Sequence, residues 1–310
     1  MSLVRWLSQI LAYIPALVPA AIIVGILTVL VSISLRAGVG WSFFGFDWNP
    51  VPSSNIVPSF GMEIFLVGSF LTAVPALVFS MLIGLGLAIA STAYLPRAIS
   101  RILDPFVDLL AGIPSVVYGI WAYVIIAPFF GGMFNPWLAG HIGFIPGFQG
   151  PVPSTGGRGL PISIFILTLM ALPITTLLIR DSLRSVPKDL WESGLALGAT
   201  RWEVTRHVAI PCASRGIFSA ALLGFGRAFG ETVAVAMLIG TAATIPKTFY
   251  GTTSTIPATM FELLDGAYGD PHLLAALADM GIVLLAITLT VNILGRRLIS
   301  SVYASEIAGL

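Results

Sequence analysis

Long apolar runs alternate with short polar segments along most of this chain. Six runs are long enough to cross a bilayer, which takes about 20 apolar residues per helix. They cover residues 14–35, 76–95, 109–130, 162–179, 217–239 and 273–294. The pattern predicts an all-α integral membrane protein with six transmembrane helices that form a single domain over residues 1–310. The first run is longer than the apolar part of a signal peptide, so we expect it to be retained as a span.

Composition supports this fold class. The chain is 57% hydrophobic and only 9% charged, whereas soluble domains average about 25% charged residues. Lys and Arg also set a direction, because they gather in the cytoplasmic loops of membrane proteins. With a cytoplasmic N-terminus, eleven basic residues lie inside and three, Arg36, Arg158 and Lys247, lie outside. The inner residues are Arg5, Arg97, Arg101, Arg180, Arg184, Lys188, Arg201, Arg206, Arg215, Arg296 and Arg297. Both termini are then expected in the cytoplasm.

The longest polar segment, 187–211, reads as two short helices that project on the cytoplasmic side. Pro187 suits a first helical turn, and Gly198 is typical of a residue just past a helix end. Thr200 and Glu203 have the spacing of a capping box, which predicts the start of the second helix. We expect Pro211 to end that helix. We call segment 187–211 the knob.

Two ionisable residues lie inside the fifth apolar run. Arg227 follows Ile217 by ten residues, which places it about 15 Å into a core about 30 Å thick if the helix is continuous. An arginine at that depth costs about 2.5–3.5 kcal/mol on the insertion scale. Glu231 is four residues further on and is expected on the same helix face. Gly226 and Gly230 form a GxxxG pattern, which predicts close approach of another helix.

Two interpretations of this pair stay open. Intramembrane charges usually line a polar pathway, where Arg227 could meet an oxyanion through its fork of donors while Glu231 holds the guanidinium. Alternatively, the pair neutralises itself and only fixes helix packing. Pro114, in the third run, is expected to bend its span and free backbone carbonyls, with Ser115 and Tyr118 adding hydroxyls to a pathway. Core packing is the equal alternative for Tyr118.

The remaining loops give weaker indications of structure and function. The outer segments 37–65, 131–160 and 245–270 are either simple connectors or contacts for an extracytoplasmic partner. Within the second of them, residues 137–148 are apolar enough for a short interfacial helix. The inner link 96–108 is amphipathic and is expected to lie along the membrane surface.

The knob resembles a loop found in ABC importer membrane subunits. Glu192-Ser193-Gly194, Gly198 and Ile210-Pro211 follow that family's Glu-Ala-Ala…Gly…Leu-Pro pattern, except at Ser193 and Gly194, where the family prefers alanines. Residues 111–119 (AGIPSVVYG) and 226–235 (GRAFGETVAV) resemble the permease subunits of the phosphate ABC importer. The continuation after Glu231 is more similar to the PstC type than to the PstA type. The likeness covers most of residues 66–300.

That resemblance implies a type I ABC importer permease of the prokaryotic plasma membrane that moves phosphate inward. Implied partners are a PstA-like sister subunit, two ATPase subunits and an extracytoplasmic phosphate-binding protein, with a homodimer as the alternative to the sister. It implies that this chain is not an enzyme and holds no cofactor, because ATP and Mg²⁺ bind the ATPase. The implied substrate pathway contains Arg227, Glu231, Ser115 and Thr232. The implied ATPase-coupling residues are Glu192, Gly198, Ala199, Thr200 and Pro211.

Other classes fit less well. The chain has no GxxxxGK[ST] phosphate-binding loop, no basic stripe for nucleic acid, and one cysteine, Cys212, in no metal-site spacing. The nearest rival is the same architecture with sulfate or molybdate as its substrate. An ion-coupled secondary transporter is another, and would be expected to show paired repeats with broken helices. A structural scaffold leaves Arg227 unexplained.

Overall fold

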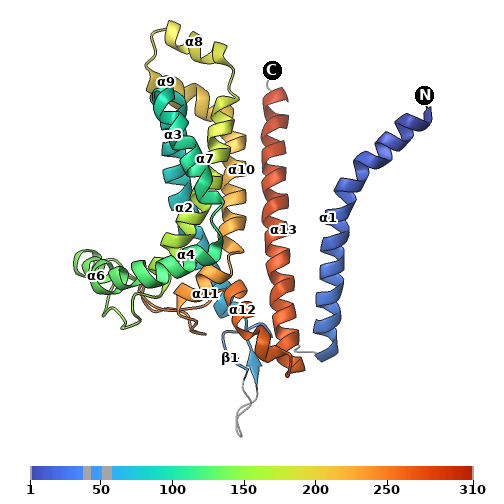
Figure 1. The fold of residues 1–310 in the computed structure, drawn as a ribbon, viewed down its shortest axis with the longest axis vertical. Helices are drawn as coiled ribbons and strands as arrows, with labels where there is room; N and C mark the ends of the chain where they lie inside the picture. Colours follow the sequence, from blue (N-terminus) through green and yellow to red (C-terminus); the bar gives the residue numbers. More distant parts are fainter. Residues whose placement is uncertain (1, 38–42, 51–57, 309–310) are drawn as a thin grey trace.

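The computed structural model describes residues 2–37, 43–50 and 58–308, which are mostly helical (Figure 1). Its α-helices are α1 (Ser2–Ala37), α2 (Glu63–Ile89), α3 (Arg97–Ala111), α4 (Ser115–Trp121), α5 (Ala127–Phe129), α6 (Asn135–Ile142), α7 (Leu160–Arg184), α8 (Lys188–Ala196), α9 (Arg201–Val204), α10 (Ile210–Phe229), α11 (Val233–Ile239), α12 (Ile256–Ala267) and α13 (Pro271–Ala308). Wider π-helical turns stand at Ala90–Tyr94, Ala122–Ile126, Phe130–Phe134 and Thr205–Ala209. A short antiparallel pair, β1 (Trp48–Asn49) and β2 (Ser59–Phe60), completes the fold.

Within the described residues the number of predicted spans, six, is confirmed, and several of their boundaries move. Helices long and apolar enough to cross a membrane cover Leu17–Arg36, Glu63–Tyr94, Ser115–Ile142, Leu160–Arg184, Arg201–Phe229 and Pro271–Gly295. The second begins 13 residues before the predicted start at 76. The third runs crosswise to α7 in Figure 1 and includes the predicted short helix, which ends at Ile142.

Helix α7 forms the centre of the bundle. Of its most apolar window, 72% is buried inside the protein, against 28% for the α2 and α10 spans and 0% for α1. Small residues let its neighbours approach closely, as in other membrane bundles. A Cβ on Gly84 of α2 would lie 3.0 Å from the Thr175 hydroxyl oxygen, and one on Gly224 of α10 would lie 2.6 Å from the Thr175 methyl carbon. Thr175 of α7 is therefore the point where the three helices meet.

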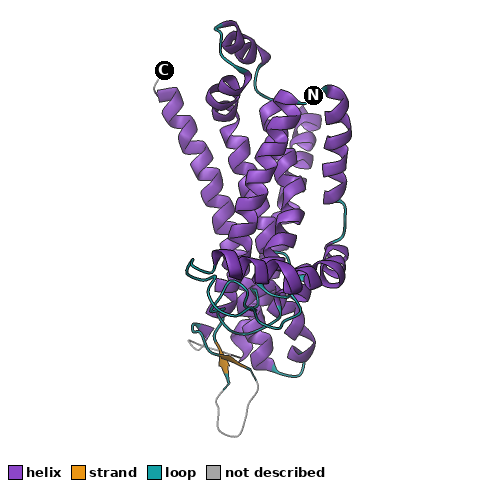
Figure 2. Cartoon of the chain, turned by 90° about the vertical axis from the view of Figure 1, so that its left-hand side faces the viewer, coloured by secondary structure: helices purple, strands orange, loops and turns teal. Residues whose placement is uncertain are grey.

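Helices α1 and α13 pack on each other beside this bundle (Figure 1). The start of α1 and the end of α13 lie at the same end of the molecule as α8, as an even number of spans requires. The longer loops gather in the opposite half of the molecule (Figure 2). There, β1, β2 and α12 pack against the start of α13 around Phe65 and Met280. Of the outer segment 37–65, residues 38–42 and 51–57 lie outside the described part.

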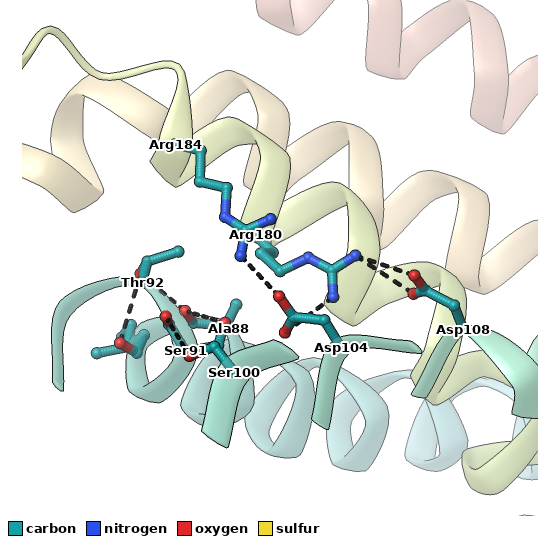
Figure 3. A network of polar contacts seen from close by, with 9 residues as sticks. Ala88, Ser91, Thr92, Ser100, Asp104, Asp108, Arg180 and Arg184 are labelled. Carbon is teal, nitrogen blue, oxygen red and sulfur yellow. Dashed lines mark hydrogen bonds and ion pairs between the residues drawn. The ribbon is translucent and has the colours of Figure 1, made fainter. Parts of the chain in front are cut away.

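A buried ion-pair cluster joins α3 to α7, and sequence analysis missed it (Figure 3). Arg180, whose side chain is 5% exposed, has Nη1 at 3.1 Å from Asp104 and donates through Nη2 to both oxygens of Asp108 at 3.3 Å. Arg184 donates to the second Asp104 oxygen at 2.7 Å. The sequence did contain a signal for this cluster. Asp104 and Asp108 are four residues apart on one helix, and Arg180 and Arg184 are four apart on another, so the two pairs can face each other.

This cluster corrects the expected placement of the amphipathic link. Residues 96–108 were predicted to lie along the membrane surface, whereas α3 runs beside α7 (Figure 1). Pairing with Arg180 would be lost if α3 turned across the end of the bundle. An unpaired buried guanidinium is costly, so the ion pairs decide the direction of α3.

Replacing Asp104 with Asn is expected to lower the free energy of unfolding by about 3 kcal/mol, because it leaves Arg180 buried with one carboxylate instead of two. The thermal unfolding midpoint of the purified chain in detergent should fall clearly. The matched control is Asp189→Asn on exposed α8, which should leave the midpoint nearly unchanged. Equal midpoints for the two variants would contradict a stabilising role for the cluster.

Candidate functional site: an intramembrane charged pair and a terminal knob

The charged pair lies where a helix is interrupted. Arg227 is in the last turn of α10, which ends at Phe229, and α11 begins at Val233. The predicted continuous span 217–239 is therefore wrong, and Figure 1 shows α11 leaving the line of α10. Both pieces stay in apolar surroundings, so hydropathy could not reveal the break. Gly230, a poor helix former, stands at the break as the C-cap of α10.

The two charges face each other across this break and do not share one helix. Arg227 Nη2 lies 4.0 Å from Glu231 Oε2, the outer limit of an ion pair. The Glu231 side chain is 7% exposed, and its Oε1 accepts a long hydrogen bond of 3.5 Å from the Ala234 N–H in the first turn of α11. The Arg227 side chain is 44% exposed. Glu231 is thus fixed by the protein, while much of the guanidinium is free to meet another group.

The ends of the helices add to this arrangement. A cation in the last turn of a helix is favoured by the helix dipole, and Arg227 has that position in α10. The Thr232 hydroxyl donates to the Gly230 carbonyl at 3.3 Å and so satisfies one of the groups that the break frees. Arg227, Glu231 and Thr232, three of the four predicted pathway residues, therefore lie together at the break.

Ser115, the fourth pathway residue, lies on the helix next to this break. It begins α4, which packs on α11 so closely that a Cβ on Gly119 would lie 3.2 Å from the Ala234 Cα. Within the described residues, the Ser115 hydroxyl makes no hydrogen bond, so the structure brings its helix to the site without joining it to Arg227 or Glu231.

Pro114 differs from expectation, and Tyr118 fits one of its two open interpretations. Pro114 does not bend a continuous span, because α3 ends at Ala111 and Pro114 caps the start of α4 with extended backbone. The buried Tyr118 donates its hydroxyl hydrogen to the Leu110 carbonyl at 3.0 Å. That bond crosses the break and satisfies a carbonyl at the end of α3, which favours the packing interpretation of Tyr118.

The predicted GxxxG contact is not made within the described residues. A Cβ on Gly226 would meet no atom within 4 Å, and Gly224 is instead the glycine of α10 that allows close approach to α7. Hydropathy could not choose between these glycines, because the choice depends on which helix face points inward. Gly226 leaves an open helix face beside the charged pair.

At the far end of the same helix, the knob has the predicted construction. α8 ends before Gly198, whose φ of +89° is the left-handed conformation expected there. Thr200 Oγ1 accepts from the Glu203 N–H at 3.3 Å, and the Thr200 N–H donates to Glu203 at 2.7 Å, so the capping box is confirmed. A Cβ on Gly194 would lie 2.9 Å from a Val204 methyl carbon, so a glycine at this departure from the family pattern lets α8 approach α9.

The prediction that Pro211 ends the second helix is wrong. Pro211 lies in the first turn of α10, and the helix continues from Arg201 to Phe229. A proline inside a helix clashes with the carbonyl four residues earlier and lacks an N–H. The wide π-helical turn Thr205–Ala209 directly precedes Pro211, and it lets the chain accommodate the proline without ending the helix. One continuous helix therefore connects the knob, where it begins, to the charged pair, where it ends.

The knob exposes apolar side chains that none of the described residues covers. Leu197 is 89% exposed and Leu195 43%, and α8 has no buried residue. Glu192 on α8 is also exposed, as are Gly198 and Thr200, while Ala199 is partly covered. Adjacent exposed apolar groups on a polar projection are typical of a protein-binding surface.

Comparison with known proteins adds a family to this geometry. Residues 80–302 match the family model described as "Binding-protein-dependent transport system inner membrane component". The chain is 37% identical over 295 residues to "Phosphate transport system permease protein PstC" of Mesorhizobium japonicum, covering 92% of this chain and 88% of the relative. It is 33% identical over 315 residues to "Phosphate transport system permease protein PstC 1" of Mycobacterium tuberculosis, covering 96% and 93%.

Solved structures agree on the fold. A structure of the MetNI methionine ABC transporter superposes with a TM-score of 0.54 at 19% identity, covering 78% of this chain and 97% of that one. A bacterial alginate ABC transporter, in complex with a pentasaccharide-bound periplasmic protein, superposes with a TM-score of 0.51 at 18% identity, covering 96% and 94%.

Proposed function

Because the chain belongs to the family of binding-protein-dependent transport system inner membrane components, we propose that it is the membrane-spanning subunit of an ATP-driven importer that carries inorganic phosphate into the cell. The relatives with 33–37% identity, which are named as phosphate permeases, are the observation that carries this proposal. The half-exposed guanidinium of Arg227 supports it, because planar bidentate donors suit phosphate oxygens.

In this proposal the chain works with three kinds of partner in a prokaryotic plasma membrane. Two ATPase subunits bind ATP and Mg²⁺ and grip the knob from the cytoplasm, where both termini also lie. An extracytoplasmic protein delivers phosphate. A PstA-like sister subunit, or a second copy of this chain, completes the pathway, and the open helix face at Gly226 is available to it.

Transport follows from the single helix that joins knob and charged pair. Closure of the ATPases on ATP moves α8 and α9, and the continuous helix from Arg201 to Phe229 transmits that motion to Arg227. The site near Arg227 and Glu231 then opens alternately to the two sides of the membrane. Glu231 limits how tightly the anion is held, since a fixed negative charge beside the guanidinium opposes a bound phosphate.

Uptake of radiolabelled phosphate into vesicles tests the proposal. Vesicles that contain this chain together with the ATPase, the sister subunit and the binding protein should accumulate phosphate when ATP is supplied, and vesicles without the ATPase should not. Excess unlabelled sulfate or molybdate should not compete; competition by either anion would favour the rival oxyanion importer.

An ion-coupled secondary transporter remains distinguishable by the same assay. Secondary transporters are expected to contain broken helices, and this chain has a broken helix between α10 and α11. A broken helix therefore does not distinguish a secondary transporter from an ATP-driven importer. Dependence on ATP does. Uphill uptake by this chain alone, driven by an ion gradient that an ionophore collapses, would overturn the importer assignment.

A further inference from the structure

A polar cavity of about 700 Å³ lies at the knob end of the bundle, far from the charged pair. It opens where the end of the α2 span meets α3, α7 and α9. Its lining residues are Ser91, Thr92, Ala93, Leu95, Ser100, Arg101, Asp104, Arg184 and Arg201. Arg201 and Arg227 are 26 residues apart along one helix, which separates them by about 39 Å at 1.5 Å per residue. This cavity is therefore distinct from the site proposed for transport.

Three arginines from three separate helices converge on this cavity, with a single carboxylate among them. Asp104 is already engaged by Arg184 at 2.7 Å and by Arg180 at 3.1 Å (Figure 3). Arg201 Nη1 donates to the Ala93 carbonyl at 3.2 Å, which holds its guanidinium at the rim. Arg101 makes no ion pair or side-chain hydrogen bond with any residue that the structure describes. The cavity therefore has an excess of positive charge that no residue described by the structure neutralises.

The hydroxyl groups that line the cavity do not provide further free donors. Ser91 and Thr92 donate to the Ala88 carbonyl at 3.2 and 2.8 Å, and Ser100 donates to the Ser91 carbonyl at 3.1 Å. Their hydrogens are used within the protein, so the free donors of the cavity are guanidinium groups. Guanidinium forks bind phosphate oxygens with particular preference over other polar groups.

A second cavity of about 330 Å³ adjoins the first and shares Thr92, Ala93, Arg184 and Arg201 with it. It adds Lys188 and Trp191 from α8. The positive surface thus continues from α3 to the knob. A ligand bound there would touch α3, α7 and the knob together.

The outer face of α3 indicates what surrounds the opening. Ile102, Phe106 and Leu109 lie along one side of this helix and are 64–75% exposed. In a membrane protein such a stripe suits lipid tails, and an exposed arginine on the same helix, such as Arg101, has a side chain long enough to reach the headgroup level. Basic pockets at this level are known to hold phosphate-bearing headgroups as a class.

We propose that this cavity binds a phosphate group through Arg101 and Arg201, with Arg184 as the third cation. The group comes either from the headgroup of an anionic phospholipid or from inorganic phosphate on the knob side of the membrane. In both cases the bound anion links the knob to α3 and α7. If the proposed function holds, occupancy of the cavity stiffens the joint that transmits motion from the ATPases.

The test uses the full chain in nanodiscs and needs no ATPase, so its outcome is independent of the proposed function. Binding of radiolabelled inorganic phosphate is measured by equilibrium dialysis in phosphatidylcholine discs, in an Arg227→Gln background that removes the intramembrane site. Retention of phosphatidylglycerol is measured by native mass spectrometry after reconstitution in mixed lipid. The variants are Arg101→Gln and Arg201→Gln, and the matched control is Arg206→Gln, an exposed knob arginine outside the cavity lining.

One of the two probes should bind saturably and should lose affinity by about tenfold in each cavity variant, as expected when one charge-assisted hydrogen bond is removed. The control should bind as the parent does. If inorganic phosphate is the probe that responds, the ligand of the cavity is the free anion. If phosphatidylglycerol responds, the ligand is the headgroup of a lipid. Equal weakening by Arg206→Gln, or no binding of either probe, would overturn the proposal.

Discussion

Replacing Arg227 with Gln is expected to lower phosphate uptake by about a hundredfold or more while the transporter still assembles. The variant loses the charged donors that we propose face the pathway. A hydrogen bond to a charged group contributes about 1.5–3 kcal/mol, or roughly ten- to hundredfold. It also leaves Glu231, 7% exposed, without its counter-charge, so the remaining negative charge repels the anion. Initial uptake rates in vesicles, normalised to the amount of assembled complex, measure the effect.

The double variant Arg227→Gln with Glu231→Gln separates the two interpretations of the pair. If Arg227 only neutralises Glu231, removing both charges should restore uptake as well as stability. If Arg227 contacts the substrate, the double variant should recover stability and remain inactive. Full uptake by the double variant would therefore remove Arg227 from the pathway and return the pair to a packing role.

Replacing Gly198 with Val is expected to uncouple ATP hydrolysis from transport. The φ of +89° at Gly198 is open to glycine and strained for a β-branched residue by about 1–2 kcal/mol or more. A Cβ there would meet no atom within 4 Å, so the effect comes from the backbone and not from a clash. The turn between α8 and α9 should change direction, and the knob should no longer transmit motion. The number of ATP molecules hydrolysed per phosphate imported should rise several-fold.

Gly198→Asn is the matched control, because asparagine adopts the left-handed conformation with little strain. It should keep near-normal coupling although it also adds a side chain. If the valine variant couples as well as the asparagine variant, the knob is not the element that receives motion from the ATPase.

Periodicity and polarity of single segments predicted much of this fold. The number of spans, the knob, its glycine turn and its capping box all follow from patterns within about ten residues of each other. Thr200 and Glu203 are one such case, since a capping box is local and its geometry is determined by spacing. The charged pair was also found locally, because two ionisable residues in an apolar run are conspicuous.

The failures have a common physical origin. The breaks at Gly112–Pro114 and Gly230–Thr232 lie within apolar surroundings, where hydropathy stays high whether or not the helix is continuous. Pro211 was read as a stop because the π-helical turn before it has no local sequence signal. The sequence pattern does not show which of Gly224 and Gly226 faces a neighbouring helix, and only the packing of α10 on α7 distinguishes them.

By itself, the sequence determined that this is a six-span membrane protein with a projecting knob and an intramembrane arginine, because burial in lipid and the capping of helix ends depend on residues near one another. Only the tertiary structure decided that α10 ends at the charged pair and joins it to the knob, that Asp104 and Asp108 hold Arg180, and that three distant arginines share one cavity. Those results depend on which helices pack side by side, and such contacts between residues far apart in the chain leave no periodic trace in it.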